Sequence, residues 1–543
     1  MKHLYLFITF FIGLNLFSQN TVGVLRNDVG SFNGYTLFAP LTSTETYLIN
    51  NCGEVVHQWS TVGITDSTPG ASVYLLENGN LLRTGKIANA NIQFGGIGGK
   101  IELYDWDNNL LWDYTYSTTE VSQHHDIYPL PNGNILILAV TIMTEAEAIQ
   151  AGRDPSKIDE GKLFNEQILE LEPFGTNQAN IVWEWNIKDH LIQDFDNTKD
   201  NFGVVSDNPQ LLDINYLNSD KGTANWLHVN SMQYYEALDQ IIFSSRLLSE
   251  VYIIDHSTTT AEATLHTGGT YSKGGDLLYR WGNKEAYQFG NSTDRTLFEQ
   301  HYPHWIPNGL TDAGKIMIFN NGGDRMFSSI DIIDPPVSSP GVYDYSVVDG
   351  YLPTVANWSY TASVPTDFVS AILSSGQRLP NGNTLICDGD SGYFFEIDSS
   401  ENIVWEYVNP DATSGPITQG TTPSFNLVFR ALKFPTDYIA FDGRDLTPSI
   451  PIEINPDLSN CSILSAEDYV LSDLKLYPNP VIDILNIRTS YNINKIEIYN
   501  ILGELISIKQ SSKSININNL SSGLYIIKIY SNNSSISKKI LKQ

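Results

Sequence analysis

The 543-residue chain has little cysteine and little charge: it contains three cysteines, and charged residues make up 17% of it. Cys52, Cys387 and Cys461 are odd in number and widely spaced, which excludes a disulfide-dense scaffold and a zinc knuckle. One long-range bridge and free buried thiols both remain open. Aromatic residues make up 11% of the chain, which indicates many half-buried strands and not a disordered polymer.

Long apolar runs are also scarce. Met1-Lys-His precedes an apolar stretch from Leu4 to Phe17, and Ser18 follows. This pattern is typical of a secretory signal peptide over residues 1–18, the alternative being a buried first strand. No cysteine follows the stretch, which argues against a lipoprotein anchor. No later run reaches the roughly 18 apolar residues of a membrane span, so we expect a soluble mature protein with no stable membrane span.

Positive charge is the third scarcity. The chain has 31 Lys and Arg against 61 Asp and Glu, a net charge of -30. Residues 473–543 carry nine basic and four acidic residues, so they are net +5 and the rest is net -35. Such an acidic body disfavours nucleic acid and anionic membranes as partners. An anionic substrate would need a local cationic pocket.

A repeated unit of strands and turns runs from about Gly34 to Pro410. Its turns contain Asn-Gly, a strong hairpin signal, because both residues tolerate a positive φ. About six units without helical periodicity predict an all-β fold, a six-bladed β-propeller in which the first strand of each blade lines a central channel. The units lie near 34–60, 73–116, 125–188, 228–282, 301–350 and 371–409.

Five of the units also contain an aromatic strand, and we expect its rings to fill the core between sheets and not to form a carbohydrate platform. The strands are 55–59, 110–114, 181–185, 277–281 and 403–407. The polar stretch 189–227 is expected to be a long connection, either a solvated loop or a carrier of binding function.

The last 70 residues differ in composition. Their motifs are Leu474-Lys-Leu-Tyr-Pro-Asn-Pro480, Ser521-Ser-Gly-Leu-Tyr525 and the basic end Lys538-Lys-Ile-Leu-Lys-Gln543. On these motifs the segment resembles the C-terminal sorting domain of the type IX secretion system of Bacteroidetes. About seven short strands predict a small β-sandwich. The resemblance implies transit through the periplasm, contact with the type IX machinery and a secreted or cell-surface protein. The alternative is an ordinary adhesive sandwich. The predicted organisation is a signal peptide at 1–18, a propeller at 19–450, a linker at 451–472 and a sorting domain at 473–543.

Three histidines begin their strands at equivalent points of the repeat. His125 and His301 each precede the glycine of a Pro-Asn-Gly turn by the same spacing, and His228 opens a third strand in the same way. A propeller would turn all three toward one mouth of the channel. The remaining histidines without a repeated register are expected to be structural: His57, His190, His256 and His266.

Arg246 ends a strand in the unit of His228. A guanidinium among imidazoles favours an anionic group over a metal ion, because a cation competes with a metal. We therefore expect no metal and no cofactor.

A family resemblance rests on several motifs together. The motifs that carry it are the spacing from His125 to His228, Asn225-Trp-Leu-His-Val-Asn-Ser-Met followed by Ser-Ser-Arg246, the Gln300-His301 pair, and Arg378-Leu-Pro-Asn-Gly-Asn-Thr-Leu-Ile-Cys387. Over residues 34–410 the chain resembles the bacterial aryl-sulfate sulfotransferases. The resemblance implies a six-bladed propeller that moves sulfuryl groups from a phenolic sulfate to a phenol without a nucleotide donor. It implies His301 as the nucleophile that becomes sulfated, surrounded by His125, His228 and Arg246, with Asn230 as a weaker substrate contact.

Some positions complicate this assignment. His124 adjoins His125 and His304 follows His301, so each is a rival for its neighbour's role. Ser374 occupies the histidine register of the last unit, and Asn320 stands where an acid is common in the family.

Two other functions stay open: a non-catalytic surface propeller that acts as an adhesin or binds carbohydrate, and an aryl sulfatase that uses water as the acceptor. A sulfatase of the formylglycine type is disfavoured, because no cysteine begins a Cys-x-Pro-x-Arg sequence.

Overall fold

The computed structural model describes residues 20–217, 223–461, 474–489, 492–500, 505–510, 512–531 and 534–543. The predicted signal peptide and part of the predicted linker lie outside them. The chain divides into two compact units, residues 1–25 with 30–457 and residues 26–29 with 458–543. Both are all-β, and the α-helices are short: α1 (Glu145–Gln150) and α2 (Thr260–Ala263). None of the helices in the described residues is long and apolar enough to cross a membrane.

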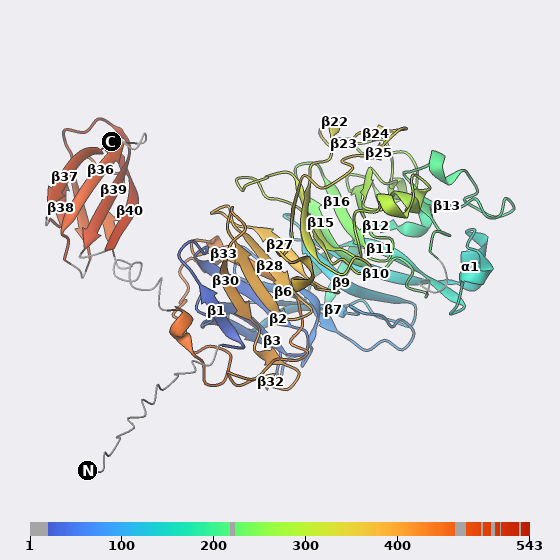
Figure 1. The fold of residues 1–543 in the computed structure, drawn as a ribbon, viewed down its shortest axis with the longest axis horizontal. Helices are drawn as coiled ribbons and strands as arrows, with labels where there is room; N and C mark the ends of the chain where they lie inside the picture. The colour runs from blue at the N-terminus through green and yellow to red at the C-terminus, as the bar shows by residue number, and fades with distance from the viewer. Residues whose placement is uncertain are drawn as a thin grey trace, which may run out of the picture. The chain divides into compact units, whose positions relative to one another are not determined.

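Six sheets of four or five strands, antiparallel within the repeats, form the body of the first unit (Figure 1). The first sheet has the order β33 (Val428–Pro435), β2 (Gly34–Pro40), β3 (Glu45–Ile49), β4 (Val55–Ser60), and the second has β5 (Pro69–Leu75), β6 (Leu81–Lys86), β7 (Gly99–Tyr104), β8 (Leu110–Thr115). The third sheet has the order β12 (Gln178–Asn186), β11 (Lys162–Phe174), β10 (Ile135–Thr144), β9 (Val121–Pro129), and the fourth has β15 (Val229–Tyr235), β16 (Gln240–Ser245), β17 (Glu250–Asp255), β18 (Tyr279–Trp281). The fifth sheet has the order β19 (His301–Trp305), β20 (Ile316–Asn320), β21 (Ser329–Ile333), β26 (Trp358–Tyr360), and the sixth has β1 (Gly23–Asn27), β30 (Ile403–Val408), β29 (Tyr393–Ile397), β28 (Thr384–Asp388), β27 (Ser375–Arg378).

Two-stranded ribbons decorate these sheets. They pair β13 (Leu191–Ile192) with β14 (Leu212–Asp213), β22 (Val337–Ser339) with β23 (Val342–Tyr343), β24 (Tyr345–Ser346) with β25 (Gly350–Tyr351), and β31 (Asp411–Ala412) with β32 (Gly415–Pro416).

The Asn-Gly sequences form the predicted hairpin turns between β5 and β6, β9 and β10, and β27 and β28. In each, only the glycine is left-handed, with φ of +84° at Gly79, +89° at Gly133 and +90° at Gly382. The glycine N–H donates to the carbonyl three residues earlier, as Gly133 does to Leu130 at 3.0 Å. The asparagines therefore do not need the positive φ that the sequence interpretation allowed them.

Four of the five aromatic strands, β4, β8, β12 and β18, are the outer strands of their sheets, and the fifth, β30, lies between β1 and β29. The prediction that their rings are core is confirmed: Trp59, Trp185 and Trp405 are at most 1% exposed. Five indole N–H groups each donate to a backbone carbonyl of another sheet or its loops at 2.6–2.9 Å. The pairs are Trp59 with Asp105, Trp112 with Gln178, Trp185 with Gly275, Trp281 with Pro353 and Trp405 with Asn51. These bonds satisfy a buried donor and tie one sheet to another.

The six inner strands contact one another in a closed cycle: β33, β5, β9, β15, β19, β27 and back to β33. One of them was not predicted. β33 lies beyond the repeats, yet it pairs antiparallel with β2 and gives the first sheet its inner strand.

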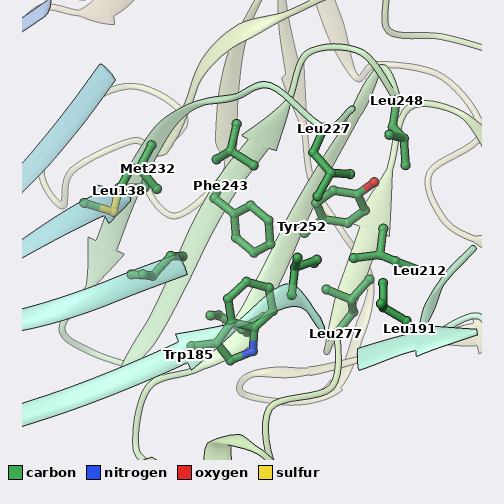
Figure 2. Packing of buried hydrophobic residues seen from close by; sticks show 14 of the residues in the cluster. Leu138, Trp185, Leu191, Leu212, Leu227, Met232, Phe243, Leu248, Tyr252 and Leu277 are labelled. Atoms are coloured by element: carbon green, nitrogen blue, oxygen red, sulfur yellow. The ribbon is translucent and has the colours of Figure 1, made fainter. Parts of the chain in front are cut away.

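The stretch 189–227 is only in part a solvated loop: in its described residues, Phe195 and Phe202 are about half exposed, but other side chains are buried. Leu191, Leu212 and Trp226 are at most 3% exposed and belong to the cluster that contains Trp185 of β12 and Phe243 of β16. Figure 2 shows Leu191 and Leu212 beside Leu277 and Trp185 in this core. Burial of these side chains pins the connection against two sheets.

The three cysteines differ in their bonding. Cys52 and Cys461 are disulfide-bonded, and Cys387 is a buried free thiol.

The second unit contains a three-stranded and a four-stranded sheet. The first comprises β34 (Lys475–Tyr477), β35 (Ile484–Arg488) and β38 (Ser514–Asn516); the second comprises β37 (Leu505–Gln510), β36 (Lys495–Asn500), β39 (Gly523–Ser531) and β40 (Ser534–Lys542). Ile487 of the first sheet and Ile527 of the second belong to one buried cluster, so the two sheets share a core.

Candidate functional site

Three neighbouring inner strands carry the predicted histidines. His125 lies on β9, His228 directly precedes β15 and His301 begins β19, and β15 contacts both of the others. Each strand has a register shift where its histidine lies or directly after it. His125 and His228 have φ of +46° and +49°, a backbone conformation that costs a non-glycine residue about 1–3 kcal/mol.

The structure brings the three imidazoles and Arg246 together. The ring centroids of His125 and His228 are 4.9 Å apart. Burial lowers the pKa of His301 to about 3, with a further contribution from the Arg246 guanidinium. Burial also lowers the pKa of His125 and His228 well below its usual range, and nearby His301 and Arg246 lower both further. At neutral pH these imidazoles are therefore uncharged.

Each histidine has a different Nδ1 partner. His301 Nδ1 lies 2.8 Å from Asn321 Oδ1, and the Asn321 amide nitrogen donates to the carbonyls of Ser370 and Leu373. Those two bonds fix the orientation of the amide, so His301 Nδ1 carries the proton and Nε2 keeps its lone pair. His228 Nδ1 lies 2.8 Å from Asn225 Nδ2, which can only donate, so the proton of His228 is on Nε2.

Arg246 is one-fifth exposed and its Nη2 forms an ion pair with Glu299 Oε2. Its backbone N–H donates to the carbonyl of His228 at 3.2 Å, which fixes it beside that histidine. Asn230 is fully buried; its amide donates to the carbonyl of Gln300 at 2.8 Å and its oxygen accepts from Ser231 Oγ. Asn230 thus links β15 to the residue that precedes His301.

The rival histidines occupy different surroundings. His124 is fully buried; its Nδ1 lies 2.9 Å from Nδ1 of His125 and its Nε2 lies 2.9 Å from Glu166 Oε2. His304 stacks on Tyr302 with ring centroids 4.4 Å apart, and its Nδ1 lies 3.1 Å from the carbonyl of Tyr302. Ser374 is buried and bonded to Ser370 and to the N–H of Gly389.

A glycine-containing loop before β7 covers the histidines. Phe94 is half-buried, and its ring centroid lies 6.1 Å from those of His125 and His228. The carbonyl of Gly96 accepts the N–H of His125 at 2.6 Å. A Cβ on Gly96 would lie 2.1 Å from His125 Nε2, so this position admits no side chain.

A buried ion pair lies next to the histidines in the chain. Arg430 of β33 binds Asp126 and the hydroxyl of Tyr74, and its guanidinium stacks 3.7 Å from the ring centroid of Tyr302. Asp126 follows His125 and Tyr302 follows His301.

Sequence reasoning missed Asn321, Glu166, Phe94 and Arg430. Asn321 and Glu166 act through contacts across strands, which no local spacing records. Asn320, which the sequence singled out, instead bonds Asp331 and the N–H of Phe298. Arg430 lies beyond the repeats and has no register to identify it.

The histidines predicted to be structural are engaged in contacts of their own. His57 stacks on Trp106, and His256 lies between Asp239 and Glu170. In the described residues, ligand atoms that could hold a metal gather at His190, His266 and Asp276. Both ring nitrogens of His190 already have partners there, Asp276 Oδ1 and the carbonyl of Ala263.

The structure is thus an all-β body of small sheets that brings uncharged imidazoles together beside a guanidinium. The sequence profile of the arylsulfotransferase (ASST) family matches residues 27–422, and the chain belongs to this family. Membership supports a transferase and suggests aryl sulfotransferase activity. The profile of a secretion system C-terminal sorting domain matches residues 475–543, so the protein is exported to the cell surface or the medium by the type IX machinery.

No curated protein matches the chain. Among solved structures, a protein of unknown function from Bacteroides caccae is 11% identical over 74% of this chain and 99% of its own, with a TM-score of 0.38. The periplasmic gluconolactonase of Pseudomonas aeruginosa is 9% identical over 69% and 96%, with a TM-score of 0.34. Virginiamycin B lyase from Staphylococcus aureus is 10% identical over 70% and 86%, with a TM-score of 0.29.

Proposed function

We propose that the six sheets are the blades of a β-propeller and that the two C-terminal sheets form a small sandwich. The cycle of contacts among the inner strands and the indole bonds from sheet to sheet support the propeller. In such a ring we expect one mouth of the channel to receive His125 at the register shift of β9, His228 directly before β15, and His301 at the start of β19.

We propose that the protein is a secreted aryl-sulfate sulfotransferase that uses a sulfohistidine at His301 and no nucleotide donor. The observation that carries this proposal is the contact of His301 Nδ1 with Asn321 Oδ1, which leaves an unprotonated Nε2 in a buried site beside Arg246. A neutral imidazole with a fixed tautomer is a ready nucleophile.

In the first half-reaction, His301 Nε2 attacks the sulfur of the aryl sulfate. The N–S bond forms while the S–O bond breaks, and its electron pair leaves with the phenol oxygen. His301 Nδ1 keeps its proton and donates it in a hydrogen bond to Asn321 Oδ1. The sulfated ring is therefore cationic and remains a good leaving group. In the second half-reaction, a phenol oxygen attacks sulfur, and the N–S electron pair returns to Nε2.

Positioned donors supply the stabilisation. By analogy with phosphoryl transfer, the transition state is loose and its charge lies on the peripheral oxygens. Arg246 and the Nε2–H of His228 are the donors for those oxygens. Asn230 acts as a positioning residue, because its bond to the carbonyl of Gln300 holds the chain that leads into His301.

The leaving phenol oxygen needs a proton, and the incoming phenol must lose one. His228 keeps its proton on Nε2 as long as Asn225 donates to Nδ1. His125 has an imidazole as its Nδ1 partner, and an imidazole nitrogen can either donate or accept. His125 is therefore the better candidate for the general acid and base.

The test is incubation with 4-nitrophenyl sulfate, with and without a phenol acceptor. Release that depends on the acceptor, together with a sulfated His301 peptide, supports the transferase. Release into water alone supports a sulfatase, and no release from any aryl sulfate supports a non-catalytic propeller. His301→Asn should abolish activity, whereas His266→Asn, at an exposed histidine, should retain it.

A further inference from the structure

His125 is connected through the imidazole of His124 to the carboxylate of Glu166. Glu166 of β11 and His124 of β9 are 3% and 0% exposed. Glu166 Oε1 accepts the N–H of Val229 at 3.1 Å, and Oε2 lies 2.9 Å from His124 Nε2. That separation is an ion-pair distance, although the ring N–H is poorly aligned with the carboxylate oxygen. Nδ1 of His124 then meets Nδ1 of His125, so the three residues form a chain that ends at the site.

Two Nδ1 atoms 2.9 Å apart need one proton between them. If His124 is neutral, with its proton on Nε2 toward Glu166, then His125 donates from Nδ1 and presents a bare Nε2 to the site. If His124 is an imidazolium paired with Glu166, it donates to His125 Nδ1, and His125 presents Nε2–H. The protonation of His124 therefore decides whether His125 is a base or an acid.

The charged groups around the two histidines are unequally placed. Burial lowers the pKa of His125 most, and His228, His124, His301 and Arg246 nearby lower it further. Glu166 is on the far side of His124, where a carboxylate stabilises an imidazolium at close range. The ring of Phe94 covers His124 with centroids 5.2 Å apart. His125 contacts His124 on one side and His228 on the other, so it connects His124 to the site.

We infer that Glu166 and His124 are positioning residues that hold the proton His125 exchanges with the phenol oxygen, an inference that rests on the proposed sulfotransferase function. When the S–O bond breaks, the leaving oxygen takes the proton of His125 Nε2, and His125 Nδ1 takes the Nδ1 proton of His124. His124 becomes neutral, and its Nε2 proton stays toward Glu166. When the acceptor phenol attacks, its proton passes to His125 Nε2 and the same two transfers run backwards, so each turnover restores the imidazolium.

The test compares aryl sulfates whose phenols differ in acidity. In Glu166→Gln, kcat/KM for 4-nitrophenyl sulfate should fall less than about fivefold, because 4-nitrophenolate leaves without a proton. For phenyl sulfate it should fall about 100-fold or more, the usual contribution of a general acid. The dependence of rate on the leaving-group pKa should therefore steepen.

The matched control is Glu170→Gln, on the same strand, where the carboxylate contacts His256 instead of His124. It should keep the wild-type dependence. His124→Asn tests the chain from its other member, and it carries the comparison if Glu166→Gln does not fold. An equal loss across all donors, or an unchanged slope, would overturn the inference while leaving the sulfotransferase intact. A wild-type protein inactive toward every aryl sulfate would instead remove the proposed function itself.

Discussion

Arg430 Nη2 lies 2.7 Å from Asp126 Oδ2 although 304 residues separate the two in sequence. Both side chains are buried. Asp126 also accepts the N–H of Met232 at 3.1 Å, and Arg430 also reaches the hydroxyl of Tyr74 at 2.6 Å. The pair thus joins inner strands of four sheets, β5, β9, β15 and β33.

Breaking this pair should destabilise the protein strongly. Asp126→Asn should lower the free energy of unfolding by about 3–5 kcal/mol, because it leaves a buried guanidinium without its counter-charge. Adding Arg430→Met should recover part of the loss. Asp324→Asn, which removes the half-exposed partner of Arg295, should cost about 1 kcal/mol or less. Urea unfolding followed by tryptophan fluorescence measures all three, and equal losses for Asp126→Asn and Asp324→Asn would contradict the prediction.

In the proposed reaction, Glu299 would compete with the sulfate group of the substrate for Arg246, because the two side chains form an ion pair. Glu299→Gln should lower KM for an aryl sulfate, by up to about fivefold, because a partly exposed ion pair is worth about 1 kcal/mol or less. Steady-state kinetics measures this, and free sulfate should become a stronger inhibitor in parallel. Asp324→Asn again serves as the control. A raised KM would show that Glu299 orients Arg246 and does not compete for it.

Gly96 tests how closely the covering loop must approach His125. Gly96→Ala should reduce kcat/KM by more than about 100-fold, since its methyl group would occupy the place of the imidazole, and a misplaced catalytic group costs about that much. Gly133→Ala is the matched control: its φ of +89° is as strained as the +82° of Gly96, but nothing lies within 4 Å of its Cβ. If both variants lose activity equally, backbone strain and not contact with His125 is responsible.

His304 should make stability depend on pH. Burial lowers its pKa to about 4, against about 6.5 in an unfolded chain. Between those values the unfolded chain binds a proton that the folded protein does not. The contribution of this group to the free energy of unfolding is therefore fully present above pH 6.5. It falls as the pH drops toward 4, by up to about 1.4 kcal/mol per pH unit. In His304→Phe this slope should be shallower by about one proton, measured by urea unfolding from pH 5 to 8; an unchanged slope refutes it.

The sequence predicted the parts of the fold that local patterns encode. Asn-Gly turns and alternating strands located most hairpins, and the buried Trp405 follows from its strand pattern alone. β33 was not predicted, because a strand that completes a sheet far away in the sequence does not belong to the repeated unit. The site divides in the same way. Strand register brought His125, His228 and His301 together, whereas Asn321 and Glu166 depend on which neighbouring strand faces each ring.

β33 also sets the order in which the molecule can mature. A chain that emerges from its N-terminus can fold β2, β3 and β4 early, but their inner edge stays open until residues 428–435 arrive. Until then Asp126, the neighbour of His125, has no cation. A partly synthesised chain would thus carry the three histidines without the complete cycle of inner-strand contacts. The proposed activity therefore requires the whole first unit, β33 included.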